Sequence, residues 1–143
     1  TSVPVELRRF AWSVLDFDAG QGGSNGAECV NMQGYSSVEK TSDTEVIETT
    51  DLIDSSATAF CGSQYGTNGD NPTDPQTLDP LQQTRTVLFK FVNTSEFQLR
   101  YFIRCCSWAG RNLMFAGHAN VALAQCPLPP QPPMPPRTPP PPP

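Results

Sequence analysis

The chain has 143 residues and a net charge of −5, with 9 Lys and Arg against 14 Asp and Glu. This charge argues against binding to nucleic acid or to anionic membranes, because phosphate groups need basic side chains opposite them. No apolar stretch approaches the roughly 20 residues of a membrane-spanning helix, so we expect no membrane span. Five cysteines in an acidic, Thr/Ser/Asn/Gly-rich chain favour an oxidising, extracellular setting.

The first predicted element covers residues 5–17, where Phe10, Trp12 and Val14 fall on one side of an alternating pattern. Alternation with period two is typical of half-buried strands, so one or two strands are expected here. Residues 18–26 are rich in glycine and predict a loop.

A short strand is predicted over residues 29–35. Residues 37–59 are polar with scattered β-branched side chains, which favours extended structure, and a short helix near residues 51–59 is the alternative. Residues 62–80 are rich in Gly, Pro, Asn and Asp and predict a long loop. Loops of that length in compact domains are usually exposed and often functional.

Two alternating runs follow within residues 84–106, separated by Asn93-Thr94-Ser95. Their apolar positions are Val87, Phe89 and Phe91 in the first run, and Phe97, Leu99, Tyr101 and Ile103 in the second. This pattern predicts a long β-hairpin with an N-glycosylation sequon at its tip, and we expect a glycan on Asn93. Residues 112–116 and 120–125 predict the final strands.

The predicted architecture is therefore an all-β domain, an antiparallel β-sandwich over residues 1–126, followed by a proline-rich segment over residues 127–143. That segment holds twelve of the sixteen prolines. Proline has a fixed φ and no N–H, so the segment is predicted to be a polyproline II rod about 50 Å long. It could serve as a stiff linker, as a ligand for an aromatic groove, or as a glycosylated rod.

The disulfide candidates are Cys29, Cys61, Cys105, Cys106 and Cys126. Cys105 and Cys106 are adjacent in a predicted strand, so their side chains should point to opposite faces and bond to different partners among the other three. The pairing itself stays open. The fifth cysteine is either a buried thiol or an intermolecular bridge, and a bond at Cys126 would fix the root of the proline rod.

Catalytic chemistry is not expected. His118 is the only histidine, no Gly-x-Ser-x-Gly motif occurs, and neither a Cys-x-x-Cys nor a histidine pair offers a zinc site. We therefore predict no enzyme activity, no cofactor and no metal.

Two groups of carboxylates need separate consideration. Asp16, Asp18, Asn25 and Glu28 are similar to a calcium loop, but Ala27 stands where an EF-hand needs its bidentate Glu. A solvated acidic turn is the favoured interpretation, and it is favoured more strongly still for the loop aspartates Asp70, Asp74 and Asp79.

The proline-rich segment carries a resemblance to a known class. A Cys-containing domain that runs into Pro-Pro-x-Pro-Pro and then unbroken proline resembles the hydroxyproline-rich glycoproteins of green-algal walls and extracellular matrix, such as pherophorin-type proteins and flagellar mastigoneme subunits. The resemblance covers the architecture and Pro127–Pro143. It implies a secreted, structural, assembling glycoprotein. Candidates for hydroxylation and O-glycosylation are Pro129, Pro130, Pro132, Pro133, Pro135, Pro136, Thr138, Pro139, Pro140, Pro141, Pro142 and Pro143.

These observations predict the protomer of an extracellular fibril or matrix polymer, whose partners are copies of itself and covalent glycans. Assembly would use the proline rod, or an N-terminal strand added to a neighbour's sheet. The predicted contacts are Val3, Val5, Leu7, Trp12 and Trp108, with Tyr35 and Tyr65 as further aromatic candidates. The alternative is a glycan-binding, lectin-like adhesin that uses the loop at residues 62–80, with the proline rod as its stalk.

Overall fold

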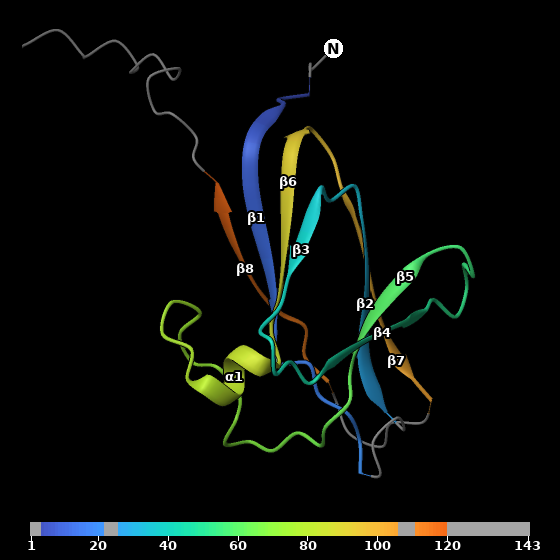
Figure 1. The fold of residues 1–143 in the computed structure, drawn as a ribbon, viewed down its shortest axis with the longest axis vertical. Coiled ribbons are helices and arrows are strands. Elements are labelled where there is room, and N and C mark those ends of the chain that lie inside the picture. Colours follow the sequence, from blue (N-terminus) through green and yellow to red (C-terminus); the bar gives the residue numbers. More distant parts are fainter. Residues whose placement is uncertain (1–3, 22–25, 106–110, 120–143) are drawn as a thin grey trace, which may run out of the picture.

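The computed structural model describes residues 4–21, 26–105 and 111–119. Within them the fold is nearly all β, and two four-stranded antiparallel sheets pack into a sandwich (Figure 1). The strand order is β3-β6-β1-β8 in one sheet and β4-β5-β2-β7 in the other. The elements are β1 (Leu7–Leu15), β2 (Ala27–Gln33), β3 (Ser37–Glu39), β4 (Val46–Thr50), β5 (Thr58–Gly62), α1 (Pro80–Thr84), β6 (Val87–Thr94), β7 (Gln98–Arg104) and β8 (Met114–Ala119). The predicted β-sandwich is confirmed.

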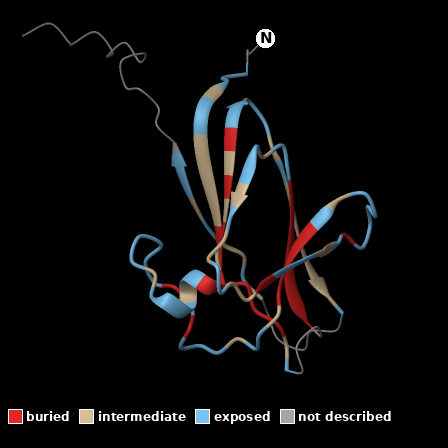
Figure 2. Cartoon of the chain, in the orientation of Figure 1, coloured by how far each residue is buried: buried red, intermediate tan, exposed pale blue. Residues whose placement is uncertain are grey.

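The core lies between the two sheets and is largely aromatic. Phe60 and Phe89 meet edge to face with ring centroids 5.1 Å apart, and Phe10 stacks on Phe91 at 4.4 Å. Figure 2 shows buried residues along β2, β5 and β6, whereas the loop before α1 is mostly exposed. The alternating side chains of the strands supply this core, as their period predicts.

The predicted hairpin over residues 84–106 is wrong. β6 pairs with β1 and β3, while β7 pairs with β2, so the two strands belong to different sheets. Residues 95–97 cross from one sheet to the other, and Phe91 meets Phe97 across the core at 5.1 Å. Alternation indicates which side chains face the core, and both runs have such a face. It does not report which backbone edges share hydrogen bonds.

The short helix considered for residues 51–59 is also absent. Asp51 instead closes a turn between β4 and β5, where its Oδ1 accepts hydrogen bonds from the N–H groups of Ile53 (2.8 Å) and Asp54 (3.1 Å). An Asp side chain that bonds nearby backbone N–H groups favours a turn over a helix. A five-residue helix, α1, appears instead at the end of the long loop.

A disulfide joins Cys29 on β2 to Cys61 on β5, at directly paired positions with Cα atoms 4.1 Å apart. Both residues are buried. Because Cys29 and Cys61 bond to each other, the expectation that Cys105 and Cys106 bond to different partners among Cys29, Cys61 and Cys126 is wrong. Its premise also fails at Cys105, which follows the last residue of β7, is exposed, and has a φ of 64°. Cys106 and Cys126 lie outside the described residues.

Candidate functional site

An open pocket lies along one edge of the sandwich, between β1, β8 and the crossing segment at residues 95–97. Trp12 stacks on Phe115 with ring centroids 4.9 Å apart, and it contacts Phe97 at 5.3 Å. Phe115 is 52% exposed. The adjoining pocket encloses about 260 Å³, and its lining includes Val5, Leu7, Phe10, Trp12 and Phe97. We call this pocket, together with Phe115, the aromatic cleft.

The sequence of β8 explains why the cleft is open. Gly117 is paired with Trp12, and a Cβ at Gly117 would lie 3.1 Å from the indole ring. Glycine therefore lets the Trp12 ring lie against the β8 backbone. β8 is also an edge strand, paired only with β1, so no further strand of the described residues covers this side.

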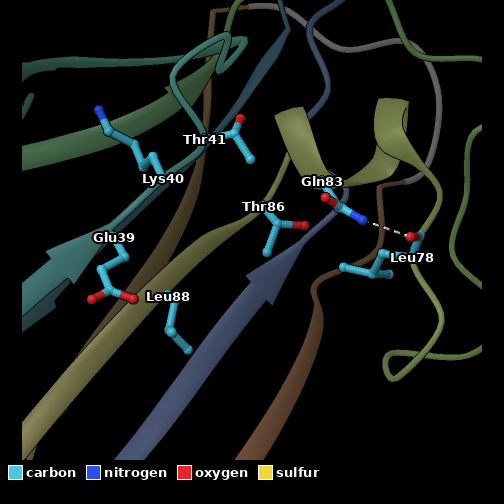
Figure 3. Close-up of a pocket in the computed structure, with 7 residues that line it drawn as sticks. All are labelled: Glu39, Lys40, Thr41, Leu78, Gln83, Thr86 and Leu88. Atoms are coloured by element: carbon cyan, nitrogen blue, oxygen red, sulfur yellow. Dashed lines mark hydrogen bonds between the residues drawn. The ribbon is translucent and has the colours of Figure 1, made fainter.

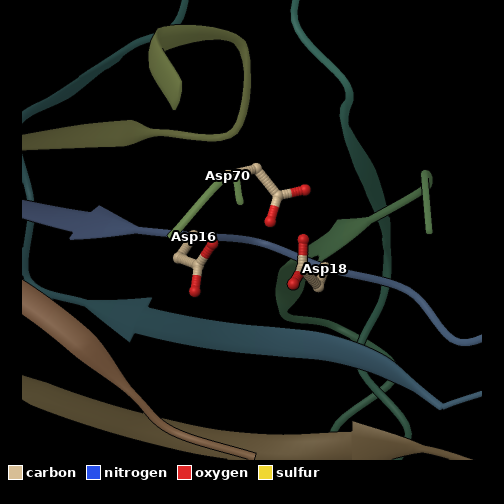
Figure 4. Close-up of side chains that lie close together, drawn as sticks. All are labelled: Asp16, Asp18 and Asp70. Atoms are coloured by element: carbon tan, nitrogen blue, oxygen red, sulfur yellow. The ribbon is translucent and has the colours of Figure 1, made fainter. Parts of the chain in front are cut away.

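A second site lies beside β2, just after the end of β1, where three carboxylates converge (Figure 4). Asp16 and Asp18 follow β1, and Asp70 comes from the long loop. One oxygen from each lies within 4.8 Å of the other two. The side chains are buried, with the three residues only 4–7% exposed. The interpretation as solvated acidic turns is therefore wrong for these three residues, which we call the acidic cluster.

Arg85 holds the acidic cluster together. Its Nη1 donates to Asp18 Oδ1 (2.8 Å) and to Asp70 Oδ2 (2.5 Å), and its Nε donates to Glu45 Oε2 (2.8 Å). Arg85 is itself only 5% exposed. Sequence reasoning missed this residue, because a lone arginine after a loop gives no local sign that it will be buried among carboxylates.

The other two loop aspartates have local structural roles. Asp79 is the N-cap of α1: its Oδ1 accepts from Gln82 N at 2.8 Å, and Gln82 Oε1 accepts from Asp79 N at 3.0 Å. Asp74 is exposed, and its Oδ1 accepts from Gln76 N at 2.9 Å. Asp followed by Pro and then by Gln at the third position is a capping-box pattern, which the sequence analysis did not use. The helix places Arg85 directly after its last turn.

Burial raises the pKa of carboxyl groups around the cluster. Glu28, whose Oε2 lies 3.4 Å from the Asp18 nitrogen, has its pKa raised to about 7, chiefly by burial. Burial, then repulsion from Asp16 and Asp70, raises the pKa of Asp18 to about 6, against the opposing effect of Arg85. Burial also raises the pKa of Asp16. Asp18 and Glu28 therefore lose their protons closer to neutral pH than ordinary carboxyl groups do.

A further pocket of about 260 Å³ lies between β3, β6 and α1 (Figure 3). Gln83 Nε2 donates to the Leu78 carbonyl at 2.9 Å across one side of it. Glu39 and Lys40 stand at the other side, and each is ion-paired elsewhere, Glu39 with Lys90 and Lys40 with Glu48. Both charged side chains at this pocket therefore already have a partner, and neither is left to bind a ligand.

The predicted assembly contacts are partly brought together. Val5, Leu7 and Trp12 line the aromatic cleft, and exposed His118 stands at its mouth. Tyr35 packs in the core, with its ring 5.4 Å from Phe89, while Tyr65 is 57% exposed. Asn93 is exposed, but it lies in β6 just before the crossing and not at a hairpin tip. Val3, Trp108 and the candidate modification sites within residues 127–143 lie outside the described residues.

Comparisons with protein-family models, with curated proteins and with solved structures found no match to this chain. Among the described residues no helix is long and apolar enough to cross a membrane.

Proposed function

We propose that this chain is the protomer of a secreted extracellular fibril or matrix polymer, in which residues 127–143 of one copy dock in the aromatic cleft of the next. The supporting observation is the cleft itself, where the rings of Trp12, Phe97 and Phe115 gather at an uncovered edge. Aromatic grooves bind proline-rich segments well, because proline rings pack on aromatic faces and a polyproline II helix loses little entropy on binding.

The occupant we propose is the segment of a second copy. β8 ends at Ala119, and seven residues separate it from Pro127. A rod of seventeen residues would span about 50 Å. A domain of this size has a radius of gyration of only about 13 Å. A stiff rod of that length would therefore extend past its own domain, where the cleft of another copy can receive it.

This contact would generate a polymer. Each copy would offer one rod and one cleft, and these are different surfaces, so the interface is heterologous. Heterologous contacts that do not close into a ring propagate as filaments. The free edge of β8 offers a second route, since an extended segment around Val5 of a neighbour could add to it as a strand. Pro4 is compatible with such an edge position.

The extracellular part of the proposal has separate support. The buried Cys29–Cys61 disulfide is typical of proteins that fold in oxidising compartments. Asn93 is exposed in Asn-Thr-Ser, so a glycan there would meet no buried surface. Hydroxylation and glycosylation of the prolines would stiffen the rod further and belong to the same proposal.

The test is Phe115→Ala in the full chain. Phe115 is half exposed, so its loss should spare folding but remove the ring that stacks on Trp12 beside the pocket. We expect electron microscopy and sedimentation velocity to find filaments for the wild type and monomers for Phe115→Ala at the same concentration. Ile53→Ala is the matched control, because Ile53 is 78% exposed on the distant β4–β5 turn. If the folded Phe115→Ala protein forms the same filaments as the wild type, the proposal is refuted. A wild-type protein that stays monomeric would also refute it.

A further inference from the structure

The acidic cluster has the geometry of an ion site. Asp16 and Asp18 are more than fifty residues from Asp70 in the chain, yet one carboxylate oxygen from each lies within 4.8 Å of the others. Calcium binds oxygen ligands at about 2.3–2.6 Å, so two ligands of one ion can stand about 4.6–5.2 Å apart. A single ion could therefore touch all three side chains, which turn toward one another in Figure 4.

The charges at the cluster are unbalanced. Two of the three buried aspartates bond to one guanidinium, that of Arg85, which also serves Glu45. A second guanidinium, that of Arg111, lies 3.9 Å from Glu28 and attracts Asp16 and Asp18 through its charge. Glu28 adds a further buried carboxyl beside Asp18. Buried charges need compensation by ions or by protons. When ionised, the three aspartates and Glu28 carry four negative charges against the two positive charges of Arg85 and Arg111, and one divalent cation would neutralise the remaining two.

One oxygen of the cluster lacks a partner. Oδ1 of Asp16 is buried and accepts no hydrogen bond from any described residue, and Asp16 as a whole is 93% buried, being 7% exposed. Buried acceptors are nearly always satisfied, by protein, by water or by an ion. Arg85 already donates to Asp18 Oδ1 and Asp70 Oδ2, and Thr67 N donates to both Asp70 oxygens, whereas Asp16 Oδ1 lacks the partner that an ion would supply.

The long loop closes over the same place. A Cβ added to Gly66 would lie 1.7 Å from Asp18 Oδ2, so the loop backbone rests directly on this carboxylate. The backbone also joins here, with Ala19 N donating to Gln64 O at 2.7 Å. An ion bound between Asp16, Asp18 and Asp70 would therefore tie the loop to the end of β1.

We propose that Asp16, Asp18 and Asp70 form a binding site for a divalent, oxygen-preferring cation, and that this cation is Ca²⁺. All three donors are carboxylate oxygens, which suit hard cations and not zinc or copper. Mg²⁺ fits less well, because it demands near-octahedral geometry and keeps several waters. Extracellular calcium modules bind at about 0.1–1 mM, the range expected for a site that shares its carboxylates with an arginine.

The test uses the full chain after dialysis against a chelator. Calorimetric titration with CaCl₂ at about pH 8 should give one site, and thermal unfolding should shift upward by more with CaCl₂ than with the same concentration of MgCl₂. Asp16→Asn should lose at least about tenfold in calcium affinity. Asn matches Asp in shape and tolerates the φ of 62° at this position, so the variant should fold. Asp74→Asn, an exposed carboxylate of the same loop, is the control and should respond like the wild type.

Two results would overturn the proposal. One is the absence of binding heat and of any thermal shift in the wild type at about 10 mM CaCl₂, well above the weakest extracellular affinities. The other is a response of Asp16→Asn equal to that of the wild type, since the calcium would then bind elsewhere. The wild-type titration shows whether the protein binds calcium even if the variant fails to fold. Weaker binding at about pH 5 than at about pH 8 should accompany a true site, because protons compete for the same oxygens.

Discussion

Replacing Glu28 with Gln should stabilise the folded protein at alkaline pH and leave its stability in acid unchanged. Glu28 is 5% exposed, and burial is the main cause that raises its pKa from 4.5 to about 7. The folded state therefore holds this proton more tightly than the unfolded state does. The contribution of Glu28 to the free energy of unfolding is therefore fully present below about pH 4.5. It is lost as the pH rises through about 7.

The size of the effect follows from the two pKa values. A rise from 4.5 to about 7 corresponds to about 3 kcal/mol, at 1.36 kcal/mol per pKa unit. Gln stays neutral at every pH, and its amide oxygen can still accept from the Asp18 N–H. The variant should therefore match the wild type at about pH 4 and exceed it by about 3 kcal/mol at about pH 8.5.

The assay is urea unfolding of both proteins across this pH range, in the presence of a chelator. Glu96→Gln serves as the control, because Glu96 is an exposed carboxylate and its replacement should leave the pH dependence unchanged. If the free energies of unfolding of wild type and Glu28→Gln run parallel from about pH 4 to 8.5, the reasoning about Glu28 is refuted.

Two further predictions concern the buried links. The Cys29–Cys61 bond spans a sequence separation of 32, so Cys29→Ala/Cys61→Ala should lose about 4 kcal/mol through the larger entropy of its unfolded chain. Urea unfolding measures this loss, and a change below about 1 kcal/mol would contradict the argument. Arg85→Met should cost about 3–5 kcal/mol at neutral pH, because it leaves carboxylates buried without their cation. This loss of unfolding free energy should shrink in acid, where the carboxylates become protonated. A loss that does not change with pH would contradict the explanation.

The sequence predicted the fold class but not the strand pairing. Period-two alternation assigned the apolar faces of residues 84–106 correctly, because it reflects burial. It could not reveal that β6 and β7 enter different sheets, since both a hairpin and a crossing bury the same faces. Helix α1 could have been predicted from Asp79, Pro80 and Gln82, which form a capping box.

Only part of the acidic cluster could be predicted from the sequence. Asp16 and Asp18 stand together in a pattern similar to a calcium loop, but neither their burial nor the approach of Asp70 has a local signal. Arg85 joins them through contacts 67 and 15 residues apart in the chain. Such long-range contacts depend on the tertiary fold, so spacing rules written for continuous loops do not find them.

The proposed assembly is tested most directly by cross-linking its two partners. A photoreactive phenylalanine analogue replaces Met134 in the full chain, and isotope-labelled and unlabelled copies are mixed before illumination. The account predicts mixed-isotope cross-links between position 134 and the aromatic cleft, at Trp12, Phe97 or Phe115. Cross-links confined to single copies, or to surfaces away from the cleft, would contradict it.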